Sequence, residues 1–214
     1  MQRHPTYTRD RIRDVAARVQ ALIYPEARAP EVLEVAGPTG RIGLDEAERL
    51  EFRPASLGEQ FGPLWSTWWF RVAATVPETW AGSRVDLLWV THSESTLWVD
   101  GRSVQGLNSS PDGARPDALL LDPCRGGERL DPRIEMACNG TFGRIARPYE
   151  SLQPVVLDRA VIARFDQRAW SLFHDLDVLR RLEADAANGL DPAWAGMLLH
   201  ELNRFCNVWD EDPA

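Results

Sequence analysis

The sequence predicts an α+β protein that is mainly β, with an antiparallel β-sandwich of the jelly-roll kind between an N-terminal helix and a C-terminal helical hairpin. Three observations predict this fold. Short apolar runs alternate with Gly- and Pro-rich turns through the middle of the chain, which is typical of a sandwich. Apolar residues recur at helical spacing before that region and again after it. The length of 214 residues suits one good-sized domain with a small appendage.

The first expected element is an amphipathic helix over about residues 8–24, which Pro25 ends. Its apolar residues recur three or four positions apart: Ile12, Val15, Ala16, Val19, Leu22 and Ile23. We therefore assign residues 1–27 to an N-terminal helix. The Pro- and Gly-punctuated stretch up to Gly62 is expected to hold only edge strands or extended connections, such as residues 32–35 and 50–52.

The centre of the chain is expected to form the middle of one antiparallel sheet. Its apolar runs are residues 65–72, 84–91, 94–99 and 102–107, with a break at residues 77–82. Only Asp100 and Gly101 separate the last two runs. An Asp-Gly pair between two such runs is a strong hairpin signal, because both turn residues need positive φ. Further strands are expected at residues 118–122 and 133–138, on either side of a turn-rich segment at 124–128.

The composition changes at Leu157. Asp158 is predicted to cap a helix whose shared apolar face carries Val161, Ile162, Phe165, Ala169, Leu172, Phe173, Leu176 and Leu179. Asn188 and Gly189 supply a stop, and Asp191 followed by Pro192 begins a second helix. The buried face of that helix is expected to hold Trp194, Met197, Leu198, Leu202 and Phe205. The expected domains are thus a helix at 1–27, a sandwich at 28–156 and a hairpin at 157–214.

Charge and hydropathy exclude several classes of partner. The net charge of −8 and the isoelectric point near 5.1 disfavour nucleic acid and anionic membranes. No apolar run approaches the roughly 20 residues of a membrane span, and the N-terminus shows no apolar signal core. Three widely spaced Cys do not make a disulfide framework, so a reducing cytoplasm is the expected setting.

Few residues are candidates for catalysis, metal binding or ligand binding. The four His are isolated from one another and from the Cys, so no metal site is expected in this segment. His92 and Glu94 could form an acid/base pair on a loop, but a solvated turn is the more ordinary interpretation. Asn139, at the end of a strand, could face a cleft, although an Asn before Gly also suits a tight turn.

The tryptophans allow two interpretations. Trp65, Trp68, Trp69, Trp80, Trp89 and Trp98 lie in or beside the expected strands. Such rings are usually core, but one or two exposed rings could stack on a sugar. The candidate carbohydrate-binding residues are Trp65, Trp68, His92, Glu94 and Asn139. No catalytic residue and no metal ligand is assigned.

With these residues laid out, the chain resembles a known family. The segments that carry the resemblance are residues 62–72, 77–82, 94–101, 105–107 and 135–143, and, near the end, 195–210 with its run 201–207. Together they resemble the amino-terminal region of the class II α-mannosidases of the cytosolic type, glycoside hydrolase family 38. The resemblance covers most of the chain from about Gly62 onward, and implies a sandwich of the galactose-binding-like type.

The family hydrolyses terminal α-mannosides with retention, using a metal, usually zinc, and a carboxylate nucleophile. The resemblance places these residues in a catalytic domain beyond Ala214, so none is carried over to this chain. The resemblance therefore implies an ancillary region with a scaffolding or substrate-entrance role. The expected partners are the catalytic domain of the same polypeptide, a mannose-containing oligosaccharide and a second copy in a homo-oligomer. The alternative is a stand-alone carbohydrate-binding module that uses exposed Trp.

Overall fold

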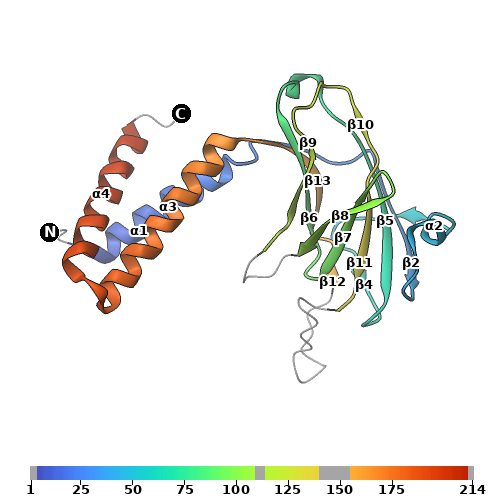
Figure 1. Ribbon diagram of the computed structural model, residues 1–214, viewed down its shortest axis with the longest axis horizontal. Helices are drawn as coiled ribbons and strands as arrows, with labels where there is room; N and C mark the ends of the chain where they lie inside the picture. Colours follow the sequence, from blue (N-terminus) through green and yellow to red (C-terminus); the bar gives the residue numbers. More distant parts are fainter. Residues whose placement is uncertain (1–3, 109–113, 140–154, 212–214) are drawn as a thin grey trace. The chain divides into compact units, whose positions relative to one another are not determined.

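The computed structural model describes residues 4–108, 114–139 and 155–211, which divide into two compact units (Figure 1). A sandwich unit spans Glu26–Arg164, and a helical unit combines Met1–Pro25 with Phe165–Ala214. The strands are β1 (Glu26–Arg28), β2 (Val32–Thr39), β3 (Arg53–Pro54), β4 (Gln60–Phe61), β5 (Thr67–Thr75), β6 (Arg84–Val90), β7 (Glu94–Val99), β8 (Arg102–Asn108), β9 (Asp117–Leu121), β10 (Arg129–Leu130), β11 (Arg133–Ala137), β12 (Val155–Val156) and β13 (Arg159–Phe165). The helices are α1 (Pro5–Ala21), α2 (Leu44–Ala47), the 3-10 turn η1 (Glu78–Trp80), α3 (Gln167–Asp185), the π-helical turn η4 (Ala186–Leu190) and α4 (Pro192–Glu211).

Two antiparallel sheets form the sandwich, as predicted. The seven-stranded sheet has the order β3-β2-β5-β11-β7-β8, with β10 paired to β5, and the four-stranded sheet has the order β1-β13-β6-β9 (Figure 1). Phe70, Ile134 and Leu97 of the first sheet share one buried core with Leu87 and Trp89 of the second. Burying these rings and branched chains is the main favourable term in the fold.

The Asp-Gly hairpin is confirmed. Asp100 has a φ of 50° and Gly101 a φ of 75°, and Val99 lies opposite Arg102 across the two-residue turn. The strands expected at residues 118–122 and 133–138 are also confirmed as β9 and β11.

The expectation of one continuous central sheet was wrong in one respect. β6 belongs to the opposite sheet, because the chain crosses the sandwich at η1, where Trp80 is buried. An apolar run reveals a strand without telling which sheet it joins. Similarly, β2 is an interior strand between β3 and β5 rather than an edge. Residues 50–52 form a connection, which is one of the two outcomes expected for them.

The helix expected to begin at Asp158 begins instead at Gln167, and residues 159–165 form β13. In β13, Ala160 and Ile162 alternate into the core, and β13 pairs with β1 on one side. The β-branched Val161 and Ile162 suit a strand, so this pairing overrides the helical spacing. The cap is Asp166, whose carboxylate accepts hydrogen bonds from the backbone of Arg168 and Ala169 at 2.8 and 2.9 Å.

The predicted hairpin of α3 and α4 is present, but α1 joins it, and Trp194 and Met197, expected on the buried face of α4, are exposed. Val15 and Val19 of α1 are buried against Leu176 of α3 and Leu202 of α4 in one cluster. The stop at Gly189, with a φ of 129°, and the cap at Asp191 are where the sequence places them. Within the described ranges, no helix is long and apolar enough to cross a membrane.

Candidate functional site

Four of the five candidate residues lie at one end of the seven-stranded sheet. There β5 and β7 begin and β11 between them ends, with Ala137 opposite both Thr67 and Glu94 (Figure 1). Just before β5, the backbone N–H of Trp65 donates to the carbonyl of Cys138 at 2.7 Å. The antiparallel register thus gathers Trp65, Glu94 and Asn139 from three separate stretches of sequence.

A small polar network joins the strand ends. The Asn139 amide donates from Nδ2 to Glu94 Oε2 at 2.8 Å, and the hydroxyl of Ser93 donates to Asn139 Oδ1 at 3.1 Å. The same hydroxyl also bonds the carbonyl of Ala137. The Ser93 hydroxyl has one hydrogen and shares it between the Ala137 carbonyl and Asn139 Oδ1, so the bond to Glu94 is the firmer hold on the Asn139 amide. Sequence reasoning missed Ser93, and its only signal was a small polar residue at the start of a strand.

His92 and Glu94 take different partners. His92 Nε2 lies 2.5 Å from the Asp158 carboxylate, and both side chains are about half exposed. Asp158 is positioned by its backbone N–H, which donates to the carbonyl of Val90 at 2.9 Å. The carboxylate that was expected to cap a helix therefore orients the imidazole, while Glu94 binds Asn139.

Two residues at this end have left-handed backbone. Trp65 has a φ of 67° and His92 a φ of 56°. For a bulky residue this conformation costs on the order of 1–2 kcal/mol, and such strain tends to collect at functional sites. Trp65 is also 58% exposed, so burial of its ring does not offset this cost.

The fifth candidate, Trp68, belongs to the core. It is only 8% exposed, its Nε1 donates to the carbonyl of Gly62, and its ring packs against Phe61 at 5.1 Å. Trp69, Trp80 and Trp89 are buried as well. These four tryptophans of the sandwich unit therefore form core rather than a wide platform, whereas the ring of Trp65, beside this end of the sheet, is exposed.

The side chains near this end that could act as nucleophiles are buried or engaged. Ser93 is buried and its hydroxyl is engaged, and the three Cys are buried free thiols. Among the described residues, no three His, Cys, Asp or Glu side chains gather so that they could hold a metal ion. The zinc implied by the resemblance therefore has no donor set among them.

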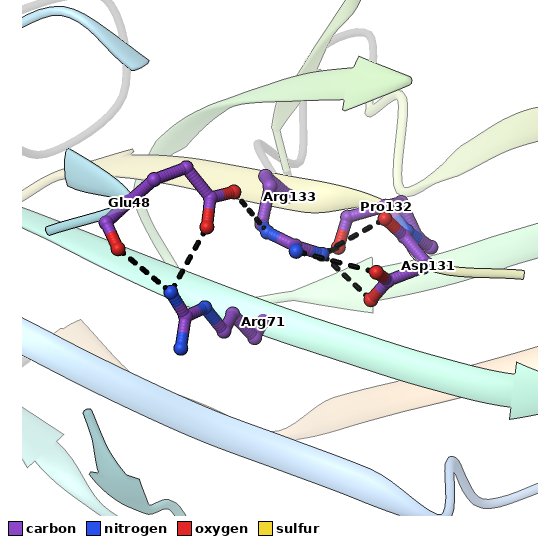
Figure 2. A network of polar contacts seen from close by, with 5 residues as sticks. All are labelled: Glu48, Arg71, Asp131, Pro132 and Arg133. Atoms are coloured by element: carbon purple, nitrogen blue, oxygen red, sulfur yellow. Dashed lines mark hydrogen bonds and ion pairs between the residues drawn. The ribbon is translucent and has the colours of Figure 1, made fainter. Parts of the chain in front are cut away.

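A second charged cluster lies on the outer face of the seven-stranded sheet (Figure 2). Glu48, just after α2, accepts from Arg71 at 2.9 Å and from Arg133 at 2.6 Å, and Arg133 also binds Asp131. Partial burial raises the pKa of Glu48, but the hydrogen bonds from the two guanidinium groups outweigh it and hold the pKa below its ordinary value. All these charges are paired with one another, so the cluster ties the segment after α2 to β5 and β11.

Comparison with known proteins gives one consistent family. Residues 29–172 match the family model described as the jelly roll domain of alpha-mannosidase. Human alpha-mannosidase 2C1 is 38% identical over 180 residues, which is 79% of this chain and 16% of the human protein. Alpha-mannosidase G of Dictyostelium discoideum is 34% identical over 178 residues, again 79% of this chain and 16% of the relative.

The chain spans about a sixth of the length of these relatives. Among solved structures, a β-glucuronidase from Ruminococcus gnavus matches with a TM-score of 0.43 and 14% identity, over 66% of this chain and 29% of that one.

Proposed function

Since the chain belongs to the α-mannosidase jelly-roll domain family, we propose that it is the ancillary amino-terminal part of an α-mannosidase that acts on terminal α-mannosides. The family match over residues 29–172 carries this proposal. It also confirms the resemblance seen in the sequence. The role proposed for the chain is to support the catalytic part of the same polypeptide or to shape its substrate entrance.

The burial of the tryptophans supports a scaffold over the alternative of a stand-alone carbohydrate-binding module. A module that binds through a platform would expose several rings, whereas Trp68, Trp69, Trp80 and Trp89 are buried. Rings packed in a core stiffen a sandwich, which is what a supporting domain requires.

The cofactor and the remaining partners follow from the family. Zinc or another divalent metal would be held by residues of the same polypeptide outside this chain, and the substrate would be a mannose-containing oligosaccharide. A homo-oligomer and a cytoplasmic setting remain predictions. Light scattering across a dilution series tests the first.

The proposal predicts that the isolated chain is catalytically silent. Incubation with an aryl α-mannoside and added zinc or cobalt should release no more phenol than buffer does. A catalytically competent mannosidase of matched concentration is the positive control. Turnover that persists through repurification, at constant specific activity, would contradict a non-catalytic role.

A further inference from the structure

We propose that the end of the seven-stranded sheet that carries Trp65, Glu94 and Asn139 binds a pyranose ring of a mannose-containing oligosaccharide. The choice of mannose rests on the proposed function. The binding chemistry rests on the site alone.

The first support is the display of Trp65. Its ring is 58% exposed and is carried on backbone with a φ of 67°. The conformation is held by the bond from Trp65 N–H to the Cys138 carbonyl and by the bond from the Ser66 hydroxyl to the Pro63 carbonyl at 2.6 Å. The fold thus maintains a strained residue that gains little burial, and a flat aromatic face matches the apolar C–H face of a pyranose.

The second support is the fixed polar pair beside that backbone. Asn139 follows Cys138 directly, and its amide is oriented by Ser93 and by Glu94. A carboxylate offers about four acceptor positions, and an amide offers two donors and two acceptors. Together they present donors and acceptors of the kind that bond neighbouring hydroxyls of a sugar.

Charge at this end of the sheet selects against other ligands. Glu94 and Asp158 are both acidic, and the chain carries a net charge of −8. Phosphates and other anions are therefore repelled. A neutral, polyhydroxylated ring is not repelled by these carboxylates, and its hydroxyls can donate hydrogen bonds to them.

The test uses saturation-transfer NMR on the 214-residue chain with methyl α-mannopyranoside, with an α-mannose disaccharide, and with methyl α-glucopyranoside. We expect transfer to both mannosides. Trp65→Gly should weaken binding at least about tenfold, the effect of losing about 1.4 kcal/mol of contact. Gly accepts positive φ, so this variant should melt no lower than the parent.

Two further variants keep the test decisive. Trp194→Ala, which removes a 41% exposed ring from α4 in the helical unit, should bind as the parent does. Asn139→Ala should weaken binding while leaving the Trp65 ring in place. If Trp65→Gly fails to fold, the test compares sugar binding by Asn139→Ala with sugar binding by Trp194→Ala.

The outcomes separate the site from the proposed function. Absence of transfer from all three sugars, or binding that neither Trp65→Gly nor Asn139→Ala weakens, overturns the site even if the chain is catalytically silent. Trp65-dependent binding of the glucoside but not the mannosides overturns the mannose assignment that rests on the proposed function. Trp65-dependent binding of the mannosides by a chain that also turns over an aryl mannoside supports the site and overturns the non-catalytic role.

Discussion

Glu48 shows what a single side chain contributes to the sandwich. Its carboxylate bridges Arg71 and Arg133 on neighbouring strands, and its carbonyl also accepts from Arg71 at 2.9 Å (Figure 2). The segment after α2 is further held by Arg71, whose guanidinium lies 3.8 Å from the centre of the Phe52 ring. These contacts fix an irregular segment to a regular sheet.

Replacing Glu48 should therefore produce a pH-dependent loss of stability. The pKa of Glu48 is lower in the folded chain than the value of about 4.5 expected on unfolding. Its contribution to stability is thus present above about pH 4.5 and is lost as the pH falls through the folded pKa. At pH 7, Glu48→Gln should lower the melting temperature by about 1–3 °C, a modest amount because the side chain is 38% exposed.

Calorimetry between pH 7 and pH 3 checks this prediction. The difference between Glu48→Gln and the parent should shrink at the acidic end. Glu46→Gln, at an exposed position of α2 two residues earlier, is the matched control and should change little at any pH. A difference that stays constant down to pH 3 would show that the ion pairs are not its cause.

The individual residues of the candidate site could be predicted from the sequence, but their proximity in the fold could not. The sequence alone identifies side chains suited to binding a sugar, which are Trp65, Glu94 and Asn139. Their convergence depends on the register of three strands, and periodicity alone does not give register. Asp158 was misassigned because a carboxylate before an apolar run resembles a helix cap whether a helix or a strand follows.

Among the elements, the hairpin of β7 and β8 was the most predictable, because its turn chemistry is local. Gly101 requires a φ of 75°, and a side chain added there would meet open space. Any loss of stability on substitution therefore comes from the backbone rather than from a clash.

Gly101→Val should destabilise the chain by about 1 kcal/mol or more, because a β-branched residue resists positive φ. The expected fall in melting temperature is about 2–4 °C. Gly106→Val is the matched control on the same hairpin, since Gly106 lies within β8, its added side chain also meets open space and its φ is not positive. Equal melting temperatures for the parent and Gly101→Val would contradict the strain argument.

The wrong predictions for β13 and β6 have the same physical cause. β13 resembles the start of a helix because Phe165, Ala169 and Leu172 continue its apolar residues at helical spacing, but its pairing with β1 on one side and β6 on the other makes it a strand. β6 was placed in the wrong sheet because its neighbours lie far away in sequence. Contacts between distant segments decided both cases, whereas the caps at Asp166 and Asp191 act within three residues.

At the scale of the whole molecule, the main difference between prediction and structure is that α1 packs against the hairpin of α3 and α4. Two helices with apolar faces as wide as those of α3 and α4 require a further surface to cover them. Within the described residues, α1 fills part of that need, with Ile12, Val15 and Val19 buried. Apolar side chains that stay exposed on the two hairpin helices include Val178, Leu182 and Met197.

Val15→Asp tests whether α1 stabilises the helical unit. An unpaired buried carboxylate costs about 3 kcal/mol or more. The helical signal at 222 nm should therefore melt at a lower temperature, while the near-ultraviolet signal of the buried tryptophans stays close to that of the parent. Ala17→Asp, on the exposed face of α1, is the control and should leave both signals unchanged. An unaffected melting curve for Val15→Asp would mean that α3 and α4 do not need α1.

The central claim is that this chain is the ancillary jelly-roll part of an α-mannosidase, and a domain exchange tests it most directly. In Dictyostelium alpha-mannosidase G, the segment that corresponds to the sandwich unit would be deleted in one variant and replaced by Glu26–Arg164 of this chain, the whole sandwich unit, in another. We predict that the deletion loses hydrolysis of an aryl α-mannoside and that the replacement restores a substantial part of it. A deletion variant as active and as stable as its parent, or a well-folded replacement without activity, would contradict the account.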